Sequence, residues 1–311
     1  MRLAASGLLI ISLLTLFACD ATEAPPADAR HSADAEHSAD AQHPVVPAVH
    51  SRVVTLAPNL TELVFAAGAG EYLVGVSAYS NYPPEVTGLP VVGDAFMIDQ
   101  ERLALLNADL LLAWQSGTPA HLVDELRRAG YVVETIRTQK LEDISAALLR
   151  IGRLTGQQDH AKQVATEFDT GLRLLGQQHT SSERIRVFYQ VSKRPLYTVN
   201  NGHFVSELIS LCGGHNIFAD LEELAPGIDV EAVIVRDPEV MLAAADAGAD
   251  AFGEWDRWPN VASNRYGNRF LLPGDEISRP TPRVLTAGAA ICAALQTARE
   301  RRAEFGNANA S

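Results

Sequence analysis

Two glutamates open matching segments of this chain. Residues 98–114 read IDQERLALLNADLLLAW and residues 228–244 read IDVEAVIVRDPEVMLAA, which places Glu101 opposite Glu231. Each segment predicts a short helix capped by an aspartate and followed by an apolar strand, with the glutamate in the first helical turn, where the helix dipole favours an acid. Capping alone explains the echo, so the pattern by itself leaves open whether the two acids have a further role.

The side chains that could do catalytic chemistry are not arranged as an enzyme needs them. The sequence has no GxSxG elbow, no HExxH motif and no glycine-rich phosphate loop, and Ser77 in GVSAY lacks the second glycine. His203 and His215 stand in turn-like contexts that are typical of exposed loop residues. A zinc or manganese site would need histidines and carboxylates from both folded halves of the chain, and the first folded half, after residue 50, offers only His121 and His160. We therefore expect that the protein is not an enzyme and that it has no resident metal or cofactor.

Composition excludes a further class. The formal net charge is −13, and no basic run is interleaved with aromatic residues, so we expect no nucleic-acid partner. A hydrophobic fraction of 47% in 311 residues is enough for two modest globular domains.

The elements that must position the two glutamates are strands and helices in alternation. Residues 53–56 and the LLLAW run predict strands, and Asn59 with Glu62 three residues later predicts the start of a helix that Gly68 ends. A similar alternating series begins near residue 185. Alternation of this kind predicts mostly parallel sheets wrapped by helices.

Between the two series, apolar residues recur every three to four positions, which predicts one long amphipathic helix. The sequence therefore predicts an α/β protein of two Rossmann-like lobes joined by one long helix, with a ligand cleft between the lobes. The expected boundaries are 51–155 for lobe one, 156–180 for the connecting helix, 181–305 for lobe two and 306–311 for a disordered tail.

The first residues predict export. Residues 1–19 combine an early arginine, an apolar core and small residues before a cysteine, as a signal peptide does. The ending LFAC resembles the lipobox of bacterial lipoproteins, so Cys19 is expected to be lipidated. Asp20 resembles the signal that retains such lipoproteins at the inner membrane of Gram-negative cells.

A repetitive segment follows the leader. Residues 20–50 contain near-copies of ADAxHS and lack the large apolar side chains that a folded core requires, so we expect a disordered tether. A coil of 31 residues has ends on the order of 30 Å apart. His31, His37 and His43 could collect a metal ion, but a solvated spacer is the favoured interpretation because nothing fixes a coordination geometry.

Five segments of the sequence resemble segments of a known protein family and occur in the same order as in that family. They are RVVTLAPNLTELVFAAG, GVSAYSNYPPE, ERLALLNADLLLAW, ELISLCGGHNIF and SRPTPRV. Together they resemble the periplasmic solute-binding proteins with a helical spine that carry cobalamin, haem or iron siderophores, and within that family the cobalamin (vitamin B12) binders. The resemblance covers residues 51 to about 295.

That resemblance implies a function. A monomer held at the periplasmic face of the inner membrane by its lipid anchor alone would capture cobalamin and deliver it to the permease dimer of an ABC importer, which cytoplasmic ATPase subunits drive. An iron siderophore or haem is the alternative ligand, and a metal ion is a more distant one.

The resemblance also implies residue roles. Trp114 ends a strand, and open α/β folds bind ligands at the carboxyl ends of their strands. The aromatic residues could instead belong to the core or its rim, and Asp275 with Arg279 could be a surface ion pair worth at most about 1 kcal/mol. The ligand-binding residues that the resemblance implies are Tyr79, Trp114, Asp275 and Arg279, and we add Phe96 and Tyr197 as candidates.

Two departures from the cobalamin binders concern the ligand. Ala95 and Ala225 stand where those proteins place tryptophans. Phe96, beside Ala95, could supply one aromatic face, and Tyr197 could supply the other. Trp255 and Trp258 fall in a loop that the sequence does not place.

Two further pairs match the family. Glu101 and Glu231 match the glutamates by which the cobalamin binder meets arginines on its two permease subunits, which makes them a predicted two-footed docking surface. Cys212 and Cys292 match its half-cystines, and an even pair in an exported protein favours a disulfide. A bond that closes a loop of about 80 residues stabilises the fold by roughly 4 kcal/mol, whereas two buried free thiols are the alternative.

Overall fold

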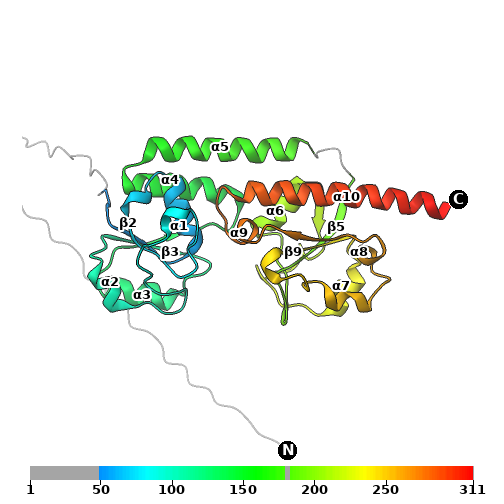
Figure 1. The fold of residues 1–311 in the computed structure, drawn as a ribbon, viewed down its shortest axis with the longest axis horizontal. Helices are drawn as coiled ribbons and strands as arrows, with labels where there is room; N and C mark the ends of the chain where they lie inside the picture. The colour runs from blue at the N-terminus through cyan, green and yellow to red at the C-terminus, as the bar shows by residue number, and fades with distance from the viewer. Residues whose placement is uncertain (1–48, 179–182, 311) are drawn as a thin grey trace, which may run out of the picture. The chain divides into compact units, whose positions relative to one another are not determined.

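The computed structural model describes residues 49–178 and 183–310 (Figure 1). The expected signal peptide, the expected lipidation site at Cys19 and the expected tether up to residue 48 lie outside these residues. Both lobes belong to one compact unit of the chain that begins at residue 46.

Lobe one is built on a four-stranded parallel sheet. Its elements are β1 (Val53–Thr55), α1 (Pro58–Ala66), η1 (Gly70–Tyr72), β2 (Leu73–Gly75), η2 (Pro84–Val86), α2 (Gln100–Leu105), β3 (Leu110–Trp114), α3 (Ala120–Arg128), β4 (Val133–Ile136) and α4 (Leu141–Thr155). The strand order is β2-β1-β3-β4, and every neighbouring pair is parallel. β1 and β3 are buried almost throughout, as expected for inner strands of a sheet covered on both faces.

Lobe two repeats this plan. Its elements are β5 (Ile185–Gln190), β6 (Ser192–Lys193), β7 (Leu196–Tyr197), α6 (Phe204–Leu211), β8 (Gly214–Asn216), α7 (Val230–Arg236), β9 (Val240–Ala244), η3 (Ala245–Ala247), η4 (Gly253–Arg257), α8 (Ala262–Arg265), β10 (Arg269–Leu272), α9 (Gly274–Ser278) and α10 (Val284–Ala310). The main sheet has the order β10-β9-β5-β8 and is parallel, while β6 and β7 form a small antiparallel ribbon. The predicted architecture of two lobes with parallel sheets is confirmed.

Two long helices run along the lobes. α5 (Gln158–Gln177) leads from lobe one toward lobe two, and α10 contacts it (Figure 1). Gly152 of α4 allows close packing on α5, because a Cβ at that position would lie 2.5 Å from the Cβ of Ala161. In the described part of the chain, none of the helices is both long enough and apolar enough to cross a membrane.

One apolar core joins the two lobes. It includes Leu60 of α1, Ile144 of α4, Phe168 of α5, Leu208 of α6 and Ile291 of α10, all buried. A core shared in this way opposes large hinge motion, because opening it would expose apolar surface to water. The lobes are therefore expected to move only slightly when a ligand binds.

The end of α10 differs from the prediction. The helix continues to Ala310, where the sequence predicted a disordered tail from residue 306. The ring of Phe305 packs edge-on against Tyr266, with 5.2 Å between the ring centroids. This contact holds the last turns of the helix against lobe two.

The predicted disulfide is present. Cys212, at the end of α6, is bonded to Cys292 in the first half of α10, and both residues are buried. The bond fastens α10 to the rest of lobe two.

His203 has a structural role. It precedes α6, and its Nδ1 accepts a hydrogen bond from the backbone N–H of Val205 at 3.3 Å. Its ring stacks on Phe204, and burial lowers the pKa of His203 to about 4. The neutral imidazole is thus the form that caps the helix, and the expectation of an exposed loop histidine is wrong here.

Candidate functional site

A pocket of about 260 Å³ lies at the carboxyl edge of the lobe one sheet. Its walls come from the segments that follow β1 and β2, from the end of β3 and from the turn around residue 95. Tyr79, Phe96 and Trp114, three of the predicted ligand-binding residues, line it together with Ala95. The structure therefore brings these predicted residues together where ligands of parallel α/β sheets bind.

Trp114 is fixed in this pocket by its surroundings. Its indole Nε1 donates a 2.8 Å hydrogen bond to Oγ1 of Thr138, and its backbone N–H donates to Thr118. The ring lies over the turn at Gly117, where an added Cβ would come within 2.1 Å of it. The indole face is therefore held in place before any ligand arrives, which reduces the entropy lost on binding.

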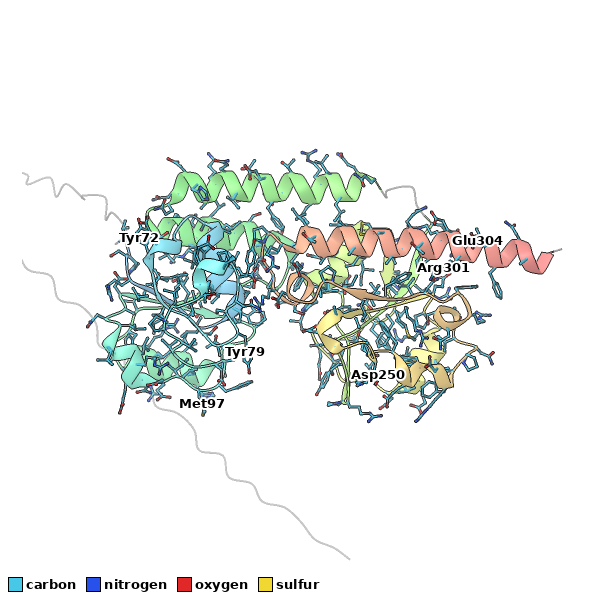
Figure 2. All side chains as sticks on the ribbon, in the orientation of Figure 1. Tyr72, Tyr79, Met97, Asp250, Arg301 and Glu304 are labelled. Atoms are coloured by element: carbon cyan, nitrogen blue, oxygen red, sulfur yellow. A yellow bond between two sulfur atoms is a disulfide. The ribbon has the colours of Figure 1, made fainter. Side chains whose placement is uncertain are left out.

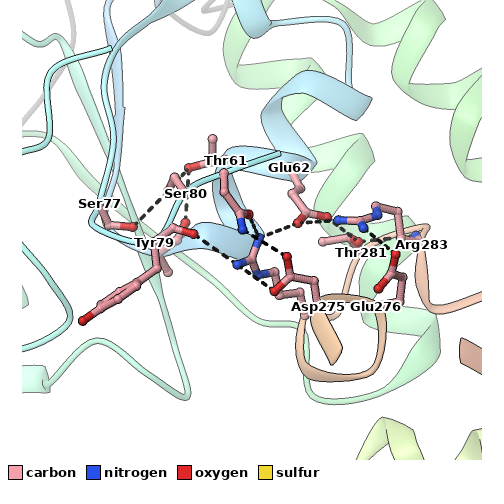
Figure 3. Close-up of polar contacts among 12 residues, drawn as sticks. Thr61, Glu62, Ser77, Tyr79, Ser80, Asp275, Glu276, Thr281 and Arg283 are labelled. Atoms are coloured by element: carbon pink, nitrogen blue, oxygen red, sulfur yellow. Dashed lines mark hydrogen bonds and ion pairs between the residues drawn. The ribbon is translucent and has the colours of Figure 1, made fainter. Parts of the chain in front are cut away.

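Tyr79 projects from the pocket rim. Its phenol ring is exposed, and its backbone has a φ of 65°, in the left-handed region that few residues other than glycine adopt. The hydroxyls of Ser77, Ser80 and Thr61 form a chain behind the turn, with separations of 3.3 and 3.0 Å (Figure 3). Strain of this kind persists only where surrounding contacts enforce it, and it concentrates at binding sites.

A tight turn carries the opposite rim. The carboxylate of Asp94 accepts hydrogen bonds from the backbone N–H groups of Phe96 at 2.8 Å and Met97 at 2.9 Å, and these bonds hold the pKa of Asp94 below its usual value. Phe96 and Met97 consequently point outward, 75% and 73% exposed. Figure 2 shows Met97 and Tyr79 on the side of lobe one away from α5. The pocket thus has an exposed apolar rim.

Arg279 connects this site to lobe two. Its guanidinium donates to Glu62 Oε1 at 2.9 Å, to Asn81 Oδ1 at 2.6 Å and to the carbonyl oxygen of Tyr79 at 3.1 Å. It also pairs with Asp275 at 3.0 Å. The side chain of Arg279 is only 12% exposed, so the alternative of an ordinary surface ion pair is wrong. Arg279 ties the Tyr79 turn of lobe one to lobe two.

Glu62 is a partner that the sequence did not reveal. Its buried carboxylate accepts hydrogen bonds from Arg279, from Arg283 at 3.1 Å and from Thr281 at 3.0 Å. A buried carboxylate needs such compensation, since removal of its partners would leave an unpaired charge. Glu62 is therefore the centre of the polar contacts between the lobes.

The predicted capping role of this segment is wrong. α1 begins at Pro58, after Ala57, and no side chain caps it. Asn59 is buried and directs its amide toward Thr138, at 3.4 Å, instead of capping the helix. Asn59 and Glu62, the two residues of the expected capping pair, instead form hydrogen bonds with residues from distant parts of the chain.

Tyr197 lies on lobe two and does not line the pocket. It forms a β-bridge with Gly227, and its ring is 3.5 Å from where a Cβ of Gly227 would stand. Ala225, two residues earlier, is exposed. Tyr197 therefore places an aromatic ring beside the segment in which the second expected tryptophan is missing.

The other two tryptophans belong to lobe two itself. Trp255 is buried, donates to Oε1 of Gln190 at 2.8 Å and packs edge-on against Phe188. Trp258 lies beside it, with 5.7 Å between the ring centroids. Both rings are structural.

Two further hollows are lined from both lobes. One of about 390 Å³ lies beside Glu62 and Arg283, and one of about 630 Å³ is lined by residues such as Lys140 and Glu207. The larger hollow has no aromatic wall, and flat apolar ligands are bound by such walls. We place the candidate site at the pocket of about 260 Å³, because it alone among these three hollows is lined by predicted ligand-binding residues, namely Tyr79, Phe96 and Trp114. The predicted cleft between the lobes stays a prediction.

Glu101 and Glu231 occupy equivalent positions in the two lobes. Each is exposed and is the second residue of its helix, α2 or α7. α2 leads into β3 and α7 leads into β9, and each of these strands is an inner strand of its sheet. Asp99 caps α2 through its side chain as predicted, whereas Asp229 precedes α7 without a side-chain cap.

The same hydrogen bonds fasten the two strands that follow. Asp109 accepts from the backbone N–H of Arg52 at 3.1 Å, and Glu239 accepts from that of Arg186 at 3.0 Å. The N–H groups of Asp109 and Glu239 return the bond to the carbonyl oxygens of the same two arginines, both at 2.9 Å. The repeat is thus a three-dimensional one.

The helix ends are fastened alike as well. Asn107 and Asp237 both have left-handed backbones, with φ values of 46° and 42°. The Nε of Arg52 donates to the carbonyl oxygen of Asn107 at 3.1 Å, and the Nε of Arg186 donates to that of Asp237 at 2.9 Å. The two glutamates therefore stand on equivalent, rigid supports.

Comparisons with known proteins agree with this geometry. The family model described as periplasmic binding protein matches residues 53–276. The chain is 35% identical to the vitamin B12-binding protein of Vibrio cholerae serotype O1 over 251 residues, which are 80% of this chain and 91% of that protein.

Solved structures show the same fold. The crystal structure of the periplasmic vitamin B12 binding protein of Vibrio cholerae matches with a TM-score of 0.73 and 34% identity, over 80% of this chain and 98% of that one. A periplasmic heme-binding protein from Roseiflexus matches with a TM-score of 0.70 and 22% identity, over 80% of this chain and 99% of that one, which shows the fold alone. On this evidence the chain belongs to the periplasmic binding protein family.

Proposed function

We propose that this protein captures cobalamin in the periplasm and delivers it to the permease dimer of an ABC importer, which cytoplasmic ATPase subunits drive. The observation that carries the proposal is the pocket walled by Tyr79, Phe96 and Trp114 at the carboxyl edge of a parallel sheet, in a chain 35% identical to a protein named as a vitamin B12 binder. Flat aromatic faces suit a flat macrocycle, which they bind by apolar contact and stacking. The protein does no chemistry on its ligand.

Asp275 and Arg279 are proposed to face the ligand from lobe two. The guanidinium of Arg279 donates hydrogen bonds to Tyr79 and Asn81, which lie at the edge of the candidate site. Polar substituents of a corrin could replace these partners without leaving the guanidinium unpaired, because Glu62 remains behind it.

Neighbouring rings compensate for the two missing tryptophans. Phe96 stands beside Ala95 on the exposed rim, and Tyr197 lies against Gly227, close to Ala225. Ala95 lines the pocket with a methyl group at a position where the cobalamin binders are expected to place a tryptophan ring. The smaller side chain at this wall is the observation that favours haem or an iron siderophore as the second candidate ligand, since their outlines differ from that of cobalamin.

Cys19 is proposed to carry the lipid that holds the protein at the periplasmic face of the inner membrane. With residues 20–50 as a tether, capture and docking would take place within reach of the same membrane, which raises the effective concentration of the loaded protein at its permease.

Replacing Tyr79 with glycine tests the proposed site. Glycine adopts the left-handed backbone of this position freely, so the free energy of unfolding should change by less than about 1 kcal/mol. Loss of the exposed phenol should raise the Kd for cyanocobalamin about tenfold, measured by quenching of tryptophan fluorescence.

Asn107→Gly is the matched control. Asn107 has the same kind of backbone but lies at the end of α2, so cyanocobalamin binding should be unchanged. A Tyr79→Gly protein that binds cyanocobalamin as tightly as the parent would exclude this pocket as the ligand site.

A further inference from the structure

Two aliphatic side chains protrude from the surface at matching places. Val235 is 84% exposed and Leu105 is 80% exposed. Every other valine, leucine or isoleucine in the described part of the chain is at most 58% exposed. Scattered apolar side chains are normal on protein surfaces, but the two most exposed valine, leucine or isoleucine side chains among the described residues stand at the same position of the internal repeat.

Each of them lies one helical turn beyond a predicted docking glutamate. Leu105 follows Glu101 by four residues in α2, and Val235 follows Glu231 by four residues in α7. Residues at this spacing are neighbours on one helix face. We call Glu101 with Leu105, and Glu231 with Val235, the two feet of the protein.

The other faces of these helices explain why the feet cannot turn inward. Leu103 and Val233, two residues after each glutamate, are 0% exposed and anchor α2 and α7 in their lobes. The hydrogen bonds of Arg52 and Arg186 fix the helix ends, as described above. The fold therefore keeps the side chains of Leu105 and Val235 exposed to solvent in the free protein.

The two parts of a foot have different physical properties. An exposed carboxylate attracts a basic partner from a distance and orients it, but salt screens that attraction and little net affinity remains. Burial of an aliphatic side chain is not screened by salt and corresponds to roughly ten- to a hundredfold in a binding constant. A foot that combines both can be steered by its charge and held by its apolar contact.

We infer that Leu105 and Val235 are docking residues that enter two equivalent apolar recesses of the partner, each beside a basic group that receives the glutamate. A partner with two equivalent sites is a symmetric dimer, and the acidic charge of −13 on this chain suits a basic one. The inference rests on the proposed function, in which that dimer is the membrane permease, and it adds the source of the binding energy.

The test measures binding of the full, cyanocobalamin-loaded protein to the cognate vitamin B12 importer complex in lipid nanodiscs. Leu105→Ser or Val235→Ser should weaken binding about tenfold, and the double variant about a hundredfold, because the sites are distant and independent. These losses should be the same at about 50 mM and about 500 mM salt, whereas losses from Glu101→Gln with Glu231→Gln should shrink at high salt.

Leu174→Ser is the matched control, since Leu174 is an exposed leucine of α5, 50% exposed and outside both feet. If the serine pair binds the importer like the parent while the glutamine pair binds more weakly, the apolar contact is refuted and the proposed docking stands. If both pairs bind like the parent, the docking surface itself is wrong. Self-association of the parent that the serine pair abolishes would assign the feet to a second copy of this chain and overturn the inference.

Discussion

Replacing Glu101 and Glu231 together with arginine abolishes cobalamin uptake by vesicles that contain the importer and leaves cyanocobalamin binding unchanged. Both side chains are exposed, and neither lines the aromatic pocket, so the fold and the ligand site have no need of them. Basic groups on a partner that receives acids would be repelled by the new arginines, and like charges in close contact cost several kcal/mol. Uptake of labelled cyanocobalamin is the measurement.

The control variant has the same change of net charge, but at two glutamates that lie away from the proposed docking surface. Glu71 and Glu223 are exposed residues, one in each lobe and outside the feet. Arginine at these two positions should leave uptake near that of the parent. If uptake persists when Glu101 and Glu231 are both arginine, the two glutamates have no docking role and the internal repeat reflects helix capping alone.

Removal of the disulfide is expected to have the largest effect on stability. The variant with alanine at Cys212 and Cys292 should lose about 4 kcal/mol of the free energy of unfolding, because the bond closes a loop over a sequence separation of 80. Urea denaturation measures this loss. The parent in the presence of a reductant should approach the same stability, while the variant should not respond to reductant. A loss below about 1 kcal/mol would mean that the unfolded chain gains little freedom when the bond is absent.

The sequence predicts the parts of this fold that depend on local pattern. The LLLAW run became β3, and the apolar repeat after residue 156 became α5, because strand and helix periods are properties of short segments. Local pattern also explains why the role of Glu62 differs from the prediction. A glutamate three residues after an asparagine predicts a capping box, but the carboxylate of Glu62 instead pairs with Arg279, which is 217 residues away.

One feature of the feet was visible in the sequence and was missed. Arg-Val begins both β series, at Arg52 and at Arg186, at similar distances before the two echoing segments. This Arg-Val pair extends the internal repeat toward the N-terminus, and it indicates that the two arginines have equivalent roles. In the structure both arginines hydrogen-bond to the ends of the helices that carry the feet. The left-handed turn at Tyr79 had no such signal, because tyrosine seldom adopts it and only the surrounding hydroxyls and Arg279 enforce it.

The most direct test of the proposed function is calorimetric titration of the protein, lacking residues 1–19, with cyanocobalamin, haem and a ferric siderophore in separate experiments. The aromatic pocket predicts saturable binding of cyanocobalamin, one molecule per chain, with a Kd in the micromolar range or tighter. Absence of saturable cyanocobalamin binding at high micromolar concentration, with haem or the siderophore bound instead, would contradict the account.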